Sequence, residues 1–466
     1  MSRINTNISS LQAYHTLTRN QSDLTTRLQR LSTGLKINTG KDAPAGLIAS
    51  ETLRSEMSGI TQAIDNSQRA GNVINTAEGA LSEVSSLLLE VQSLTNQAAN
   101  SGALSPEEIK ANQLQVDAIL NSINRIANTT QFNGVKLLNG SLDYTTSGVA
   151  ASSIATMQIN SAKVPDNGSI SVVVEVTGSA LTGEVQFAQA GLGPAPVTIE
   201  IAGTTGVEQL SFAGSTHSSG IAVAINQLKD ATGVSAYVSG AVLRLNSVGY
   251  GATEFVSVKT IAGTFVDGKD NGQNAQVSIN GSQAQVDGLA ASVRTSTLDL
   301  TIDLHKDFGQ QLMSKSFAIT SGGAKFQLGS EVNRQGQANI GIGSVATTKL
   351  GNQVLGYMSS LASGGDNALT SGNTIQAQKV LSEAIRQVAT LRGRLGAFQK
   401  NTLETNINNL SVTLENVTAS ESAIRDADFA TETAAMTRAQ ILVQANTSVL
   451  AQANAAPQNV LSLLGG

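Results

Sequence analysis

The sequence predicts an α+β protein of several domains, in which a long coiled-coil-like helical bundle from both chain ends carries a β-rich central insertion. Residues 397–456 contain no Gly or Pro, and apolar residues recur there every seven positions. The N-terminal part of the chain shows the same repeat. Between about residues 140 and 344 the repeat gives way to short β-branched runs separated by Gly, Asn, Asp and Ser.

The C-terminal stretch predicts the longest rod. A helix over residues 397–456 would be ~90 Å long at ~1.5 Å per residue, whereas a globular helix averages about 11–12 residues. A compact domain cannot cover such a rod, so we expect its partners to be other long helices, in this chain or in neighbouring copies. The predicted seam residues are Leu403, Leu410 and Val417.

The end of this stretch is almost uncharged. Within residues 429–466 the only charged side chains are Glu432 and Arg438. Because a solvated terminal helix usually carries many charges, we expect assembly to bury this segment. Pro457 is expected to end the helix. The apolar tip beyond it comprises Val460, Leu461, Leu463 and Leu464.

The N-terminal stretch predicts an amphipathic helix from about Ile8. We expect its seam to pair with the C-terminal helix, driven by apolar contacts because that partner is nearly uncharged. The seam residues expected in this pair are Leu17, Leu24, Leu31, Leu442 and Val449.

A second N-terminal helix is predicted after a break marked by Gly40 and Pro44. Pro44 suits its first turn, and the helix runs to about Ala99. Its seven-residue row, interrupted by Ser67, favours a coiled-coil-like bundle over an ordinary core helix. The row comprises Leu53, Ile60, Ile74, Leu81 and Leu88.

A third helix is predicted to start at Ser105, with Pro106 at its first position and Glu108 closing a capping box. It ends before Asn133-Gly134, which favours a tight reversal. The clearest strands of the insertion are residues 169–177, 197–202, 241–246 and 255–259. Residues 221–228 predict a helix leading into a hairpin, and helical repeats resume after about Lys349.

Five segments follow from this pattern. They are an N-terminal helix (1–42), which pairs with a C-terminal helix (425–466); the two halves of the rod (43–140 and 345–424); and an insertion of one or two β-rich subdomains (141–344).

Composition argues against several functions. The chain has no Cys, and its three His are far apart, so we expect no metal site, cofactor or thiolate chemistry. The net charge of −5 without a basic block argues against nucleic-acid binding, and no apolar run approaches the ~20 residues of a membrane span. We find no HExxH, P-loop or GxSxG motif and expect no enzyme. Asp426 and Asp428 are expected to punctuate the helix or to form local ion pairs.

Four motifs resemble bacterial flagellin. The resemblance covers roughly residues 1–140 and 345–466, with the motifs in the family's order. Residues 221–259 look like a small repeat module found in some flagellins and hook-associated proteins. The motifs are residues 4–7 (INTN), 31–49 (LSTGLKINTGKDAPAGLIA), 130–137 (TQFNGVKL) and 441–464 (ILVQANTSVLAQANAAPQNVLSLL).

The resemblance implies a structural subunit that polymerises into the flagellar filament for swimming. In such proteins the termini pair as concentric helical layers around a channel, and the insertion projects outward. The implied partners are other copies of the chain, an export chaperone at the C-terminal helices, and hook-associated and cap proteins. The resemblance also implies that the chain is secreted unfolded through the flagellar type III export apparatus. That route would explain why the N-terminus shows no Sec-type signal.

One family feature differs. Flagellins sensed by the innate receptor TLR5 carry an Arg near the position of Glu90, upstream of Leu94, and a Glu at or near the position of Gln115. Because both residues are changed here, we expect weak recognition by that receptor. Two alternatives stay open from the sequence: a hook–filament junction protein, and a filament whose β insertion also acts as an adhesin.

Overall fold

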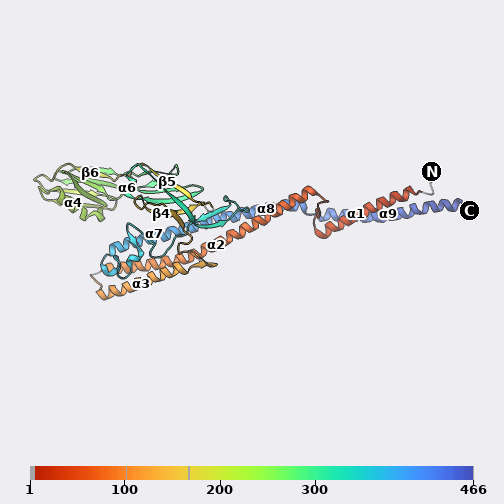
Figure 1. Cartoon of the computed structure of the whole chain (residues 1–466), viewed down its shortest axis with the longest axis horizontal. Coiled ribbons are helices and arrows are strands. Elements are labelled where there is room, and N and C mark those ends of the chain that lie inside the picture. Colours follow the sequence, from red (N-terminus) through yellow and green to blue (C-terminus); the bar gives the residue numbers. More distant parts are fainter. Residues whose placement is uncertain (1–5, 101, 166–167, 465–466) are drawn as a thin grey trace. The chain divides into compact units, whose positions relative to one another are not determined.

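The computed structural model describes residues 6–100, 102–165 and 168–464 (Figure 1). These residues form two compact units. The first contains the described chain up to Gln68, the segment Gln327–Gly336, and the chain from Thr402 onward; the second contains Arg69–Phe326 and Gln337–Asn401. Each unit therefore combines segments from both ends of the chain, with strands in the middle of the sequence. This confirms the predicted fold class, whereas the five-segment division stays a prediction.

The first unit is helical. Its helices are α1 (Ile8–Thr33), the first part of α2 (Pro44–Ala99), α8 (Thr405–Arg425) and α9 (Phe429–Leu464). α1 begins where the Asn7 side chain accepts the Ser10 N–H at 2.9 Å, and it ends at Gly34, whose φ of 72° suits glycine. α2 begins at Pro44, as expected.

The C-terminal rod is not one unbroken α-helix over residues 397–456, because it changes to π-helical geometry at one point and stops at another. A π-helical segment (Gln399–Glu404) separates α7 (Thr374–Phe398) from α8. Asp426 is extended and ends α8. The Asp428 carboxylate then accepts the backbone N–H of Ala430 at 2.9 Å and of Thr431 at 3.3 Å, which caps α9. The two aspartates therefore punctuate the helix, as predicted.

The serine that interrupts the heptad row of α2 has a polar partner. Ser67 is fully buried. The Asn406 side-chain amide of α8 donates to the Ser67 hydroxyl at 3.1 Å and to the Leu328 carbonyl at 3.0 Å. A leucine at position 67 would leave the Asn406 amide without one of its two acceptors. The polar residue in the row is therefore explained by Asn406, whose amide also bonds to the segment 327–336.

The helices of the second unit are the rest of α2, α3 (Pro106–Thr129) and α7. The predicted capping box is present: the Glu108 N–H donates to the Ser105 hydroxyl at 3.3 Å, and the Ser105 N–H donates to the Glu108 carboxylate at 2.7 Å. Arg392 of α7 pairs with Glu78 of α2 at 2.7 Å. Apolar rows of all three helices are buried.

The segment before α7 contradicts the expected return of helical repeats at Lys349. It forms β21 (Gly351–Asn352), β22 (Gly356–Tyr357) and two 3₁₀ turns, Met358–Leu361 and Leu369–Ser371. The physical reason is glycine: Gly351 and Gly356 adopt φ of 112° and 106°, which no helix interior accommodates.

The insertion follows a short hairpin, β1 (Gln131–Phe132) and β2 (Val135–Lys136), whose turn has positive φ at Asn133 and Gly134 as predicted. The insertion has two hydrophobic cores. The first core lies between the sheets β14-β13-β5-β18-β3 and β15-β16-β17-β4. The second lies among the sheets β6-β10-β9 and β12-β11-β7-β8 and helix α4.

The elements of the first core are β3 (Tyr144–Ser147), β4 (Ile154–Ala162), β5 (Ile170–Gly178), β13 (Gln276–Ile279), β14 (Ser282–Gln283), β15 (Gln285–Asp287), β16 (Ala290–Arg294), β17 (Leu298–Leu304), α6 (Lys306–Gly309) and β18 (Ser314–Gly322). The elements of the second are β6 (Glu184–Phe187), β7 (Val197–Ala202), β8 (Val207–Phe212), α4 (Ser218–Gln227), α5 (Lys229–Thr232), β9 (Val234–Ser239), β10 (Val242–Ser247), β11 (Phe255–Ala262) and β12 (Gly268–Asn271). A separate hairpin pairs β19 (Ala324–Gln327) with β20 (Gln337–Ile340).

A half-buried charge joins α7 to the insertion within the second unit. The Arg394 guanidinium donates to the Asn160 carbonyl at 3.2 Å and to the Gly341 carbonyl at 3.1 Å. Burial lowers the pKa of Arg394, and the negative charge of Asp143 partly offsets this. Burial raises the pKa of the Asp143 carboxyl, while the Tyr144 N–H bond and the charge of Arg394 act in the opposite direction. These groups hold the start of β3 close to α7.

One sheet edge of the second core is covered by a side chain. β9 lies at the edge of the sheet β6-β10-β9. Asn226 of α4 donates to the Ala236 carbonyl at 2.7 Å and accepts the Ala236 N–H at 2.9 Å. The amide therefore occupies backbone groups that could otherwise pair with a strand of another chain.

Candidate functional site

The two helices nearest the chain ends form an antiparallel pair within the first unit (Figure 1). Hydrogen bonds join the start of α1 to the far part of α9 and the end of α1 to the start of α9. Leu17, Leu24 and Leu31 are half-buried on the α1 side, as the sequence predicts for seam residues. Ala13 and Ala439 are the most buried apolar residues of the pair, at 8% and 2% exposure.

The α9 side of this seam corrects the sequence prediction. Leu442 and Val449 are 44% and 53% exposed, so they do not lie in the seam of this chain. Between residues 441 and 456 the half-buried positions are instead Val443, Asn446, Leu450 and Ala453. In a stretch made of Ala, aliphatic and small uncharged polar residues, several heptad rows look alike, and the sequence does not show which row faces the partner.

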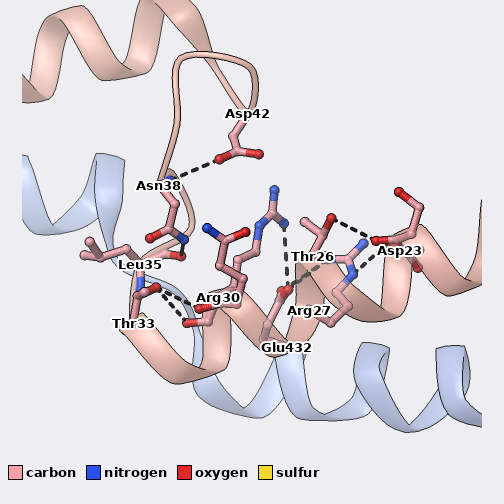
Figure 2. A network of polar contacts seen from close by, with 11 residues as sticks. Asp23, Thr26, Arg27, Arg30, Thr33, Leu35, Asn38, Asp42 and Glu432 are labelled. Atoms are coloured by element: carbon pink, nitrogen blue, oxygen red, sulfur yellow. Dashed lines mark hydrogen bonds and ion pairs between the residues drawn. The ribbon is translucent and has the colours of Figure 1, made fainter.

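A charged cluster closes one end of the pair (Figure 2). Arg27 Nη1 lies 3.1 Å and Arg30 Nη1 lies 3.8 Å from Glu432 Oε1, and Asp23 holds Arg27 at 3.2 Å. Glu432 is 7% exposed. It also lies in the first turn of α9, where a negative charge is favoured by the helix dipole. The pairing is therefore not driven by apolar contacts alone.

A hydrogen bond from a side chain to the backbone closes the other end. α9 continues to Leu464, so the expectation that Pro457 ends the helix is wrong. Pro457 has no N–H and cannot bond to the carbonyl four residues earlier, that of Ala453. The Asn7 side-chain amide donates to this carbonyl at 2.8 Å, which supplies the missing donor. Nearby, Ser10 Oγ lies 2.6 Å from Asn454 Oδ1.

The outer surface of the pair remains apolar. Large apolar side chains on both helices are 44–68% exposed, although the pair has already buried its own seam. These exposed residues are Ile8, Leu11, Tyr14, Leu28, Phe429, Ile441, Leu442 and Val449. We call them the outer apolar face. The side chains of the predicted apolar tip, and residues 4 and 5 of the first motif, lie outside the described residues.

The predicted rod seam residues lie on inward positions of their own units. In the first unit Ile60 and Leu403 are buried, whereas Leu53, Leu410 and Val417 are half-buried. The seam residues in the second unit, Ile74, Leu81 and Leu88, are fully buried.

The three positions of the receptor region differ in exposure. Glu90 on α2 and Gln115 on α3 are exposed. Leu94 is 6% exposed and packs inside the unit. Two of the three side chains are thus accessible to a large partner.

The histidines have local roles or none. The rings of His217 and His305 accept backbone N–H groups at the starts of α4 and α6, both at 3.4 Å, and His15 lies on the exposed side of α1. In the part of the chain that the structure describes, no group of three or more His, Asp or Glu could hold a metal ion. No helix among the described residues is long and apolar enough to cross a membrane.

Comparison with known proteins matches both helical regions. Residues 4–143 match the bacterial flagellin N-terminal helical region, and residues 378–464 match the C-terminal helical region. A flagellin of Salmonella rubislaw is 32% identical, with 99% of each chain covered. The chain belongs to the bacterial flagellin family. Flagellin B of Vibrio cholerae is 30% identical, again with 99% of each chain covered.

Solved structures give weaker likenesses. A flagellar hook-associated protein-3 from Legionella pneumophila is 16% identical, with 80% of this chain and 98% of that chain covered and a TM-score of 0.32. FliC from Burkholderia pseudomallei is 17% identical, with 71% and 99% covered and a TM-score of 0.24.

The family membership gives the role of the chain. Flagellins are structural proteins, and this flagellin is a self-assembling subunit of the flagellar filament. The relatives named flagellin match the whole length, which favours the filament subunit over the hook–filament junction protein.

Proposed function

We propose that this flagellin joins its neighbours through the outer apolar face of the α1–α9 pair, which forms the inner core of the filament. The observation that carries this is the exposure of large apolar side chains on both helices after they have paired. Isolated helix pairs seldom leave such a surface to water, because burying each side chain contributes ~1.5–3 kcal/mol. Copies related by a screw operation would bury it repeatedly and give an open polymer.

The test is seeded growth of purified subunits. Leu442→Gln and Val449→Gln together remove two exposed apolar groups that make no seam contact in the single chain. We expect the double variant to keep its circular dichroism spectrum and to elongate filament seeds at least ten-fold more slowly. As a matched control, Val332→Gln changes a residue that is 90% exposed in the segment 327–336, and its growth should be normal. Normal growth of the double variant would contradict the proposal.

The same termini support a proposal on export. The subunit would leave the cell unfolded through the flagellar type III apparatus and act outside it. An export chaperone would cover the apolar side chains of α9 until polymerisation, since α9 has only two charges to keep it soluble. The chaperone should bind the full chain, and it should not bind a chain that lacks residues 429–466.

The ends of the filament imply further partners, hook-associated proteins at the base and a cap protein at the tip, which would contact the same terminal helices. For TLR5 we propose weak recognition. Glu90 and Gln115 are accessible, and neither carries the charge found in sensed flagellins. A reporter-cell response at ordinary flagellin doses would refute this.

A further inference from the structure

The seam of the α1–α9 pair does not by itself select one alignment. On α9 the inward positions are Ala439, Val443, Asn446 and Leu450, and the half-buried leucines of α1 repeat every seven residues. If α9 moved along α1 by seven residues, other small and aliphatic side chains would fill most of the seam. Asn446 is only half-buried, so water can satisfy its amide in any alignment. A pair used for assembly needs a single alignment, because every subunit must present the same outer face.

Several polar contacts hold the observed alignment. At the junction of the two helices the Ala427 N–H donates to the Gly34 carbonyl at 2.9 Å, and near the other end Ser10 Oγ lies 2.6 Å from Asn454 Oδ1. Two further contacts distinguish this alignment from those shifted by seven residues. One is the Arg27–Glu432 ion pair with Arg30 beside it, and the other is the bond from Asn7 to the Ala453 carbonyl. They lie near opposite ends of the pair, ~30 Å apart at ~1.5 Å per residue. We propose that these two contacts, beyond the backbone bonds at the junction, hold the register along the length of the α1–α9 pair and are specificity-determining positions for assembly. This inference rests on the proposed role of the pair in the filament core.

The ion pair penalises a shift because Glu432 is buried and is the only carboxylate of α9. In the observed register it lies opposite Arg27. A seven-residue shift would place it opposite Asn20 in one direction or Gly34, beyond the end of α1, in the other. The first shift would leave a buried carboxylate without its guanidinium partner, which is strongly unfavourable. The second would move the carboxylate past the end of α1 and break the ion pair.

The amide bond penalises the same shifts for a different reason. Interior carbonyls of a helix accept the N–H four residues further on. Ala453 is an exception because residue 457 is Pro. Asn7 therefore meets an acceptor that the helix itself leaves open. After a shift the amide would face a carbonyl that is already bonded, and the Ala453 carbonyl would lose its donor.

The chain has no Cys, so disulfide cross-links can report the register directly. Ser10→Cys with Asn454→Cys reports the observed register, since Ser10 Oγ and Asn454 Oδ1 are 2.6 Å apart. Ser10→Cys with Thr447→Cys reports the register shifted by seven residues. Each reporter pair is placed in the otherwise unchanged full chain and in an unlocked chain, Asn7→Ala with Glu432→Gln. Arg438→Gln, which removes the other charge of α9 from an exposed site, is the matched control.

Oxidised chains are scored as monomeric cross-links on non-reducing gels, both in solution and in seeded filaments. In the unchanged and control chains we expect the shifted reporter to give less than a tenth of the yield of the native reporter. In the unlocked chain its yield should rise at least five-fold. A ratio of shifted to native yield that stays the same in the unlocked chain would overturn the proposal.

A charge-exchanged variant tests whether a change in cross-linking comes only from loss of folding. Arg27→Glu, Arg30→Glu and Glu432→Arg together keep an ion pair of reversed sense. This variant should cross-link through the native reporter only, and shifting as large as in the unlocked chain would also overturn the proposal. Filament growth is measured separately. A chain with native cross-links that does not elongate seeds would count against the assembly proposal and leave the register inference standing.

Discussion

Replacing Arg394 by Met should destabilise the second unit, and more at pH 7 than at pH 4. The guanidinium makes two charge-assisted hydrogen bonds, at 3.2 and 3.1 Å, to the carbonyls of Asn160 and Gly341. It also supplies positive charge near the half-buried Asp143. Hydrogen bonds to a charged group contribute about 1.5–3 kcal/mol each, so we expect the free energy of unfolding at pH 7 to fall by about 3 kcal/mol.

The pH dependence follows from Asp143. Burial already raises its pKa above the ordinary value of 3.8, and Arg394 is one of the groups that limit the rise. Without Arg394 the pKa in the folded state rises further. A carboxyl whose folded pKa is raised contributes stability that is present at low pH and is lost as the pH rises through that folded pKa. At pH 4 more of Asp143 is protonated in the folded state than at pH 7, and a protonated carboxyl needs no countercharge, so the variant should lose less stability there.

The assay is guanidinium unfolding followed by far-ultraviolet circular dichroism at both pH values. Arg334→Met, which removes an exposed guanidinium, serves as the control and should change stability little. The reasoning would be refuted by an Arg394→Met loss below about 1 kcal/mol, or by equal losses at the two pH values.

Three further predictions concern other sites. Asn7→Ala should lower the thermal dissociation temperature of filaments, because it removes a hydrogen bond that contributes about 1 kcal/mol. It should have no such effect when Pro457→Ala has restored the missing backbone N–H, and equal effects in both backgrounds would contradict our account. Glu90→Arg with Gln115→Glu should raise the TLR5 reporter response of the full chain, and an unchanged response would show that other contacts limit recognition. Asn226→Val should uncover the edge of β9 and increase lateral bundling of filaments seen by electron microscopy, whereas unbundled filaments would mean that the edge is protected in another way.

Much of the helical architecture follows from the sequence because its signals are local. The seven-residue row from Leu53 to Leu88 lies on inward positions, with Ser67 buried among them. The capping box at Ser105 and the Asn133-Gly134 turn fold as their residue types dictate. These signals depend on neighbouring residues and need no knowledge of distant partners.

The errors arise where a distant segment decides the outcome. Leu442 and Val449 fit a heptad row as well as Val443 and Leu450 do, and only the position of α1 distinguishes the two rows. Pro457 is accommodated in α9, where an amide from the other chain end bonds to the freed carbonyl.

The charged cluster at Glu432 was not predicted either. A signal for it existed in the sequence, because a lone carboxylate in an almost uncharged helix needs a reason to be there. The arginines of α1 provide that reason, but they are about four hundred positions away in the chain. Sequence spacing alone could not have paired them.

The chain enters and leaves the second core of the insertion at almost the same point. Leu181 and Gln273 exchange backbone hydrogen bonds at 2.9 and 2.8 Å, so the chain leaves the first core and re-enters it across one bridge. Apart from Tyr250, which packs against the first core, the segment between them could be exchanged as a cassette without lengthening any strand of that core. A foreign domain with adjacent termini, grafted at this bridge, would be displayed once per subunit, turning the filament into a regularly spaced scaffold for enzymes or antigens.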